Sequence, residues 1–84
     1  MTFYVYIARC NDKTLYTGYC KDLKSRENKH NIGKGAKYTK YRRPVKIVYY
    51  EELEDKVGAM KREIQIKKLS RIEKEGLISN KLKN

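Results

Sequence analysis

The chain has 84 residues, of which 21 are lysine or arginine and 10 are aspartate or glutamate, giving a formal net charge of +11. This length allows one domain, residues 1–84, and no apolar run is long enough to cross a bilayer. A polyanion relieves the self-repulsion of so much positive charge, so nucleic acid is the leading partner. The alternatives are an anionic membrane surface, for which no basic helix with bulky aromatics is present, and lysines that serve only solubility.

Two β-type runs open the chain at residues 4–10 and 15–20, and the polar stretch between them predicts a hairpin. Alternate side chains of a strand share a face. We therefore expect one apolar face and one that carries phenols. The apolar face holds Phe3, Val5 and Ile7, and the other holds Tyr4, Tyr6 and Ala8.

The length of the hairpin loop decides whether Tyr6 and Tyr16 lie on the same face, because an odd loop places them together and an even loop separates them. We predict an odd loop, with Tyr6 beside Gly18 and Tyr16 beside Ala8. Gly18 is then expected to leave a gap beside Tyr6 for a substrate or a metal-bound water. The alternative is that both tyrosines are packing residues, since tyrosine is common in strands.

Asp22 is a natural N-cap for a helix that begins at Leu23 and ends in the stretch 31–35, which contains two glycines. The helix has a single large apolar residue, so it lacks the apolar stripe with which helices of small domains usually dock. Arg26 and His30 are four residues apart and share a face with Asp22. We interpret both as site residues. The alternatives are an Asp22–Arg26 ion pair and a protonated His30 at the helix C-terminus.

Residues 33–46 are basic, contain no acid and are interleaved with tyrosine, and their glycines and Pro44 predict a loop rather than a regular element. Lysine and arginine contact phosphates, and tyrosine stacks on bases or lies along sugars. We therefore predict a nucleic-acid contact here, against the alternative of a solvated run of charge. The predicted contact residues are Lys34, Lys37, Tyr38, Lys40, Arg42 and Arg43.

A third strand is predicted at residues 45–50, and Glu54 or Asp55 is placed to cap the helix that follows. We expect Met60 to fill the core from the apolar side of this helix. The predicted apolar side consists of Leu53, Val57, Met60, Ile64 and Ile66. Glu63 lies at its edge, and we weigh an ion pair with Lys67 against a carboxylate ligand for a hard divalent cation.

Ser70 and Glu73 form a capping box that opens a short last helix, and residues 80–84 are expected to be a frayed tail. Cys10 and Cys20 are expected to lie too far apart in the hairpin for a disulfide, and their spacing matches no zinc pattern. No signal peptide is recognised, so we expect reduced cysteines and a cytoplasmic location.

The order strand, strand, helix, strand, helix, helix, with these polar residues, resembles the GIY-YIG nuclease domain and in particular its small stand-alone bacterial members. The two signature motifs correspond to residues 4–6 and 16–18, with Tyr4 in place of a glycine and Thr17 in place of an isoleucine. Residues 22–26 with His30 look like the family's helix motif. The stretches 34–39 and 67–70 are also similar to the stand-alone members.

The resemblance implies an α+β fold in which a three-stranded antiparallel sheet is flanked by three helices in the order ββαβαα. It also implies hydrolysis of DNA phosphodiester bonds, in DNA repair or processing, assisted by one divalent ion, Mg²⁺ or Mn²⁺. Tyr6 and Tyr16 would be the active-site phenols and Arg26 the cation that binds phosphate. His30 would be a supporting acid/base or hydrogen-bonding group, and Glu63 the metal ligand.

A phenol deprotonates water at neutral pH only if nearby cations stabilise its phenolate, because its ordinary pKa is near ~10. We expect Arg26, the basic loop and the metal ion to provide that stabilisation. The leading hypothesis is therefore an endonuclease of low sequence specificity acting on DNA in preference to RNA, with a protein partner for targeting as a further option. The alternatives are a non-catalytic nucleic-acid-binding module that uses residues 34–46, and a protein-interaction domain that uses exposed Tyr49 and Tyr50.

Overall fold

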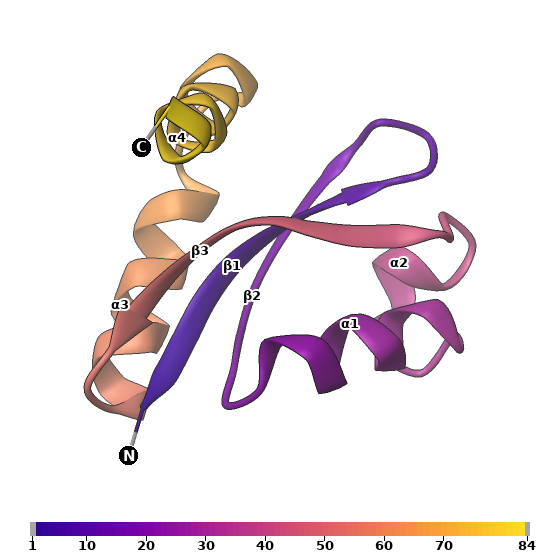
Figure 1. The fold of residues 1–84 in the computed structure, drawn as a ribbon, viewed down its shortest axis with the longest axis horizontal. Helices are drawn as coiled ribbons and strands as arrows, with labels where there is room; N and C mark the ends of the chain where they lie inside the picture. Colours follow the sequence, from indigo (N-terminus) through magenta and orange to yellow (C-terminus); the bar gives the residue numbers. More distant parts are fainter. Residues whose placement is uncertain (1, 84) are drawn as a thin grey trace.

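The computed structural model describes residues 2–83, with side chains described as far as residue 80. Along the chain it contains three strands and four helices within the described residues (Figure 1). The elements are β1 (Phe3–Cys10), β2 (Leu15–Cys20), α1 (Leu23–Asn31), α2 (Lys37–Lys40), β3 (Val45–Leu53), α3 (Lys56–Lys67) and α4 (Arg71–Lys83). No helix in this part of the chain is both long and apolar enough to span a membrane.

The three strands form one antiparallel sheet in the order β2-β1-β3, with the N-terminal strand in the centre. Between β1 and β2 the register pairs Tyr6 with Gly18 and Ala8 with Tyr16. The odd hairpin loop is therefore confirmed, and both tyrosines lie on the same face of the sheet. The strand β2 forms one edge of the sheet, and α3 and α1 lie on opposite sides of the sheet (Figure 1).

Each face of the sheet has its own core. On one face, Val5, Ile7 and Tyr49 pack with Ile66 of α3 and Ile78 of α4. The other face carries Tyr6, Ala8, Cys10, Cys20 and Val45, with Leu23 of α1 packed against them. The predicted division of β1 into an apolar and a phenolic face is confirmed, and both cysteines are buried and free.

Helix α1 docks through polar side chains, which explains why its sequence lacks an apolar stripe. The Asp22 carboxylate accepts a hydrogen bond from Ser25 N at 2.9 Å and caps the first turn. Glu27 accepts from Ile47 N at 2.7 Å, and the Asn31 amide bonds both the N–H and the C=O of Val45, at 2.7 and 2.8 Å. These bonds satisfy backbone groups on the outer edge of β3, which would otherwise be unpaired.

The prediction for the buried side of α3 was right for Ile66 and Leu53, which pack in the core, and wrong for the other three residues. Val57, Met60 and Ile64 are 60%, 42% and 53% exposed, whereas Ala59 and Ile66 are fully buried. Leu53, which the prediction counted with the helix, instead ends β3. Asp55, one of the two predicted caps, caps α3 by accepting a hydrogen bond from Gly58 N at 2.7 Å.

A polar pair also fixes the rotation of α3 about its axis. Arg62 donates to both carboxylate oxygens of Glu51 on β3, at 2.7 and 2.8 Å. Two parallel hydrogen bonds of this kind hold the guanidinium in one orientation. The side of the helix that carries Ala59, Glu63 and Ile66 therefore faces the sheet, and the Val57–Met60–Ile64 stripe faces outward.

Several boundaries also differ from those expected. The third strand extends to Leu53, and the predicted loop contains the four-residue helix α2.

Tyr49, expected on the surface, is only 8% exposed and donates to the Glu51 carboxylate, whereas Tyr50 is 40% exposed.

The capping box is confirmed, because Ser70 N donates to Glu73 and Glu73 N donates to the Ser70 hydroxyl, at 3.0 and 3.2 Å. The tail expected to fray at residues 80–84 is instead part of α4 as far as Lys83, and Asn84 lies outside the described residues.

Candidate active site

Tyr6 and His30 form a buried pair on the phenolic face of the sheet. Tyr6 is in the central strand and His30 in the last turn of α1, and the Tyr6 hydroxyl lies 2.7 Å from His30 Nε2. Both side chains are fully buried. Burial and the nearby Arg26 lower the pKa of His30, so the ring is neutral at pH 7. The alternative of a protonated histidine at the helix C-terminus is therefore wrong.

Thr39 of α2 fixes which nitrogen of His30 carries the proton. Its hydroxyl lies 2.8 Å from His30 Nδ1 and donates its one hydrogen to the Ala36 carbonyl oxygen at 3.1 Å. Because that hydrogen is used, Nδ1 must donate to the Thr39 oxygen, and Nε2 is left as an acceptor. The Tyr6 hydroxyl then donates to His30. The result is a chain of three hydrogen bonds from Tyr6 through His30 and Thr39 to Ala36.

Two glycines give these rings room. A Cβ on Gly18 would lie 2.8 Å from the Tyr6 hydroxyl oxygen, and one on Gly35 would lie 2.3 Å from His30 Nδ1. The expected gap beside Tyr6 is therefore not open to a substrate or a metal-bound water, because the Tyr6 phenol itself occupies it. Gly35 has the same role in the loop, because only a residue without a side chain lets the loop backbone lie this close to the imidazole ring of His30.

Tyr16 covers the buried pair and is itself only partly buried. Its ring centroid lies 5.3 Å from that of His30 and 6.3 Å from that of Tyr6, and its outer side stacks on Tyr38 at 5.8 Å. Tyr38 was predicted as a nucleic-acid contact, and in this structure its ring also extends the aromatic cluster. Of the two phenols, Tyr16 is thus the one that solvent reaches.

Arg26 places a positive charge beside both phenols. Burial raises the pKa of Tyr6 well above its usual value, with a further contribution from Tyr16, and Arg26 acts in the opposite direction. Burial and the Glu63 carboxylate raise the pKa of Tyr16, and Arg26 again lowers it. In the free protein both phenols therefore stay protonated at neutral pH. The expected stabilisation of a phenolate by nearby cations is therefore not found among the protein's own groups.

Glu63 approaches this cluster from α3, on the other side of the β2 edge. Its side chain is 18% exposed, and Lys67 Nζ lies 3.8 Å from its carboxylate, so the predicted i,i+4 pair is present. Its effect on the pKa of Tyr16 makes the two groups electrostatic neighbours.

The donor set around Glu63 fits only a loosely held metal ion. Within the described residues, no three His, Cys, Asp or Glu side chains converge on a metal site. A single partly exposed carboxylate suits a hydrated Mg²⁺ or Mn²⁺ that takes its other ligands from water and a phosphate, and it does not suit a cage built only from protein groups.

The predicted contact residues of the basic loop divide into two groups. Lys34, Lys37 and Lys40 are exposed and line a shallow hollow over α2. Arg42 instead pairs with Asp12 at 3.0 Å and stacks over Tyr38, and Arg43 donates to the carbonyl oxygens of Lys40 and Asn31 at 2.9 and 3.3 Å. The two arginines therefore hold the loop against the rest of the chain.

Sequence reasoning missed Thr39 and Gly35 as parts of the site. One signal could have pointed to Thr39, because it is the only serine or threonine in the basic stretch 33–46. Its partner His30 is nine residues away, however, and nothing in the spacing pairs the two.

Comparisons with known proteins relate the chain to one family. A model of the GIY-YIG catalytic domain matches residues 2–75. A UPF0213 protein of Staphylococcus saprophyticus is 57% identical over 76 residues, which cover 90% of this chain and 93% of that protein. One from Staphylococcus epidermidis is 58% identical over 71 residues, covering 84% and 87%.

Two solved structures have the same fold. The NMR structure of a UPF0213 protein from Bacillus halodurans is 47% identical with a TM-score of 0.62, covering 96% of this chain and 86% of that one. The NMR structure of a protein from E. faecalis is 36% identical with a TM-score of 0.65, covering 100% and 90%.

Proposed function

The chain belongs to the GIY-YIG catalytic-domain family, and from this membership we propose that it is a metal-dependent endonuclease that hydrolyses DNA phosphodiester bonds with low sequence specificity. The observation that carries the proposal is the convergence of Tyr6, Tyr16 and His30 from three separate elements, with ring centroids 5.3 to 6.3 Å apart. Arg26 acts electrostatically on both phenols, and Glu63 acts on Tyr16.

In this proposal the residues have distinct roles. Tyr16 is the phenol that contacts the substrate, since Tyr6 and His30 are fully buried beneath it. Its hydroxyl orients the attacking water. Arg26 binds a phosphate oxygen, for which a guanidinium has suitable bidentate geometry, and offsets the charge that builds up during attack. Tyr6 and His30 are positioning residues that keep Tyr16 and Arg26 in place.

Glu63 would hold the divalent ion. Once bound, such an ion supplies Lewis-acid polarisation of the phosphate and offsets the carboxylate charge that raises the pKa of Tyr16. Lys67, which pairs with Glu63 in the free protein, must then release the carboxylate. The Lys67 side chain is 53% exposed and its Nζ is 3.8 Å from the carboxylate, so this ion pair is weak and costs little to open.

The decisive experiment is cleavage of supercoiled plasmid and of labelled branched and single-stranded DNA with Mg²⁺, Mn²⁺ or EDTA. The wild type is compared with Glu63→Gln and Tyr16→Phe. Glu54→Gln and Tyr41→Phe are matched controls, because both residues are exposed and lie outside the cluster. We expect metal-dependent nicking that is lost in the first two variants and kept in the controls. Nicking that survives Glu63→Gln would refute the metal ligand, and its absence from all proteins would refute the nuclease.

A non-catalytic nucleic-acid-binding module is the second candidate, favoured by the full burial of Tyr6, which keeps that phenol from any substrate. It predicts binding of DNA that stays intact, is the same with Mg²⁺ and with EDTA, and survives Glu63→Gln. Its affinity would still fall steeply with salt, because the contact would be made by lysines.

A further inference from the structure

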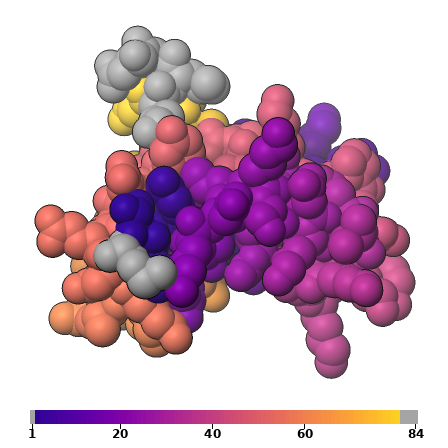
Figure 2. Space-filling model, turned by 60° about the horizontal axis from the view of Figure 1, so that its bottom comes forward, coloured from indigo at the N-terminus to yellow at the C-terminus, as the bar shows by residue number. Residues whose placement is uncertain are grey.

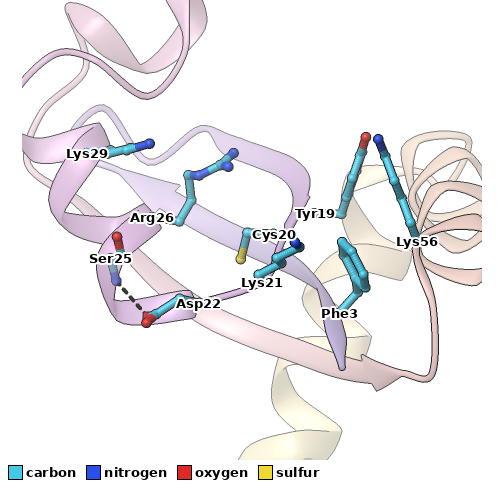
Figure 3. A pocket seen from close by; sticks show the side chains of 9 residues that line it. All are labelled: Phe3, Tyr19, Cys20, Lys21, Asp22, Ser25, Arg26, Lys29 and Lys56. Carbon is cyan, nitrogen blue, oxygen red and sulfur yellow. Dashed lines mark hydrogen bonds between the residues drawn. The ribbon is translucent and has the colours of Figure 1, made fainter. Parts of the chain in front are cut away.

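A cavity of about 420 Å³ opens at the end of β2, between the first turns of α1 and α3 (Figure 3). The space-filling view of this face shows the start of β1, in indigo, between the orange α3 and the purple β2–α1 segment (Figure 2). We call this cavity the β2-end groove. The residues that matter here are Phe3, Tyr19, Lys21, Arg26, Lys29 and Lys56, all of which line it.

The β2-end groove is strongly cationic. Four of its lining side chains, Lys21, Arg26, Lys29 and Lys56, are positively charged. Asp22 is the one acid among the described lining residues, and its carboxylate is engaged in capping α1 through Ser25 N (Figure 3). A hollow lined by four like charges concentrates an anionic ligand. The repulsion among these side chains falls when such a ligand binds.

The groove also has an aromatic wall. Tyr19 pairs with Val5 across the sheet and is partly exposed, and its ring stands at the rim beside Lys56 (Figure 3). The second aromatic residue, Phe3, is partly covered, because Lys21 Nζ lies 5.5 Å from its ring centroid. Tyr19 is therefore the ring that a ligand in the groove can reach. Aromatic rings next to cations are typical of surfaces that bind single-stranded nucleic acid.

Arg26 connects the groove with the candidate active site. It lines the groove, and its charge lowers the pKa of both Tyr6 and Tyr16. Because β2 is an edge strand, no other strand lies between the two places, and a DNA strand can pass along this edge. If the phosphate to be cleaved lies at Arg26, the neighbouring nucleotide reaches the β2-end groove.

We propose that the β2-end groove binds one unpaired nucleotide next to the cleaved phosphodiester, with its base against Tyr19 and its phosphates beside Lys21 and Lys29. This inference deepens the proposed function and rests on it for the identity of the cleaved bond. The volume of about 420 Å³ is typical of a site for one small ligand. A base inside a duplex is stacked on both sides and cannot face Tyr19, so the preferred substrate is single-stranded or unpaired beside the cut.

Binding can be tested without cleavage, by adding EDTA. The probes are a fluorescent thymidine hexanucleotide and an abasic hexamer that has the same phosphates and no bases. We expect Tyr19→Leu to weaken binding of the thymidine probe by roughly 5- to 100-fold and to leave the abasic probe unchanged. Lys29→Gln is expected to weaken both probes equally. Tyr50→Leu, at a 40% exposed tyrosine of β3, is the matched control and should change neither.

Equal weakening of both probes by Tyr19→Leu would overturn the proposal, because the effect would then be structural. Unchanged binding of the thymidine probe, or tighter binding of a duplex hexamer, would overturn it too. Since Tyr19 packs against the core, the double variant Lys29→Gln/Lys56→Gln provides an independent test at two exposed positions. If that protein binds both probes as the wild type does, the groove is not the site. Failure of the proposed nuclease is seen separately, as intact DNA when Mg²⁺ is added to a protein that binds both probes.

Discussion

The hydroxyl of Tyr6 lies 2.7 Å from Nε2 of His30, and both side chains are excluded from solvent. A tyrosine and a histidine in this arrangement could in principle exchange roles as donor and acceptor. The third member of the chain decides between them, because Thr39 uses its only hydrogen on Ala36 and must accept from His30 Nδ1. The pair is therefore held in one protonation pattern by a residue of the neighbouring loop.

Thr39→Val should destabilise the protein by about 1 to 3 kcal/mol, because it leaves the buried His30 Nδ1–H without an acceptor. Valine has nearly the same shape as threonine, so the loss reports the hydrogen bond rather than a cavity. Thr39→Ser keeps the hydroxyl and should lose less. Urea denaturation measures the stability, and the ¹⁵N shifts of the His30 ring report its tautomer. An unchanged tautomer and unchanged stability in Thr39→Val would contradict the assigned role.

The pH dependence of stability should carry the signature of His30. Its pKa is lowered in the folded protein, so the unfolded state takes up a proton first as the pH falls. The stability that neutral His30 contributes is therefore fully present above the pKa of the histidine in the unfolded chain, about 6.5. It is lost as the pH falls below that value. Asp12, Glu73 and Glu75 also have lowered pKa values, but their contributions are lost only at more acidic pH.

Urea unfolding at about pH 8 and at about pH 5.5 separates this effect from that of the carboxyls. His30→Gln should show a smaller difference in stability between the two conditions than the wild type. An equal difference in both proteins would mean that His30 is not neutral and buried in the way the structure places it.

Gly18→Ala should destabilise the protein by about 1 to 3 kcal/mol, because the new methyl group would lie 2.8 Å from the Tyr6 hydroxyl and 3.2 Å from a Tyr16 ring carbon. The Tyr6 ring is fully buried and its hydroxyl is hydrogen-bonded to His30, so it cannot move aside freely. Gly76→Ala is the matched control. No atom lies within 4 Å of its added Cβ, and it replaces a helical glycine of α4, so it should stabilise the protein by about 0.5 to 1 kcal/mol. Thermal unfolding of both variants checks these two predictions. Changes in stability of the same sign and size in both variants would refute them.

The sheet could be predicted from the sequence because its information is local. Alternation in residues 3–8 sets the two faces of the first strand. The hairpin loop has either an odd or an even number of residues, so Tyr16 can lie on only one of two faces. The helix caps at Asp22 and Asp55 were predictable for the same reason, since a capping carboxylate and the backbone N–H that donates to it lie three residues apart.

The rest of the site depends on pairings distant in the chain, which periodicity does not encode. The rotation of α3 is set by Arg62 and Glu51, which are eleven residues apart in different elements. This polar pair outweighs an apolar stripe that, taken alone, predicted the opposite face. The role of Thr39 likewise depends on a loop that folds back over His30. Composition identified the basic loop but could not separate exposed lysines from arginines that bond the chain's own carbonyls.

That separation leads to a prediction about the two kinds of cation in the basic loop. Lys34→Gln and Lys37→Gln remove exposed charges and should each lower the slope of log affinity against log salt by about 0.7 to 0.9. Their stability should stay within about 0.5 kcal/mol of the wild type, as is usual for surface substitutions.

Arg43→Gln should behave in the opposite way. Its guanidinium donates to the carbonyl oxygens of Lys40 and Asn31, and losing these bonds should cost on the order of 1 kcal/mol of stability. Its effect on the salt slope should be smaller than that of either lysine, because its guanidinium is already hydrogen-bonded to backbone carbonyl oxygens. Fluorescence anisotropy over a range of salt concentrations, together with urea denaturation, distinguishes the two classes. If Arg43→Gln lowers the salt slope as much as Lys37→Gln and leaves stability unchanged, then the arginine is a phosphate contact and the loop is held by other bonds.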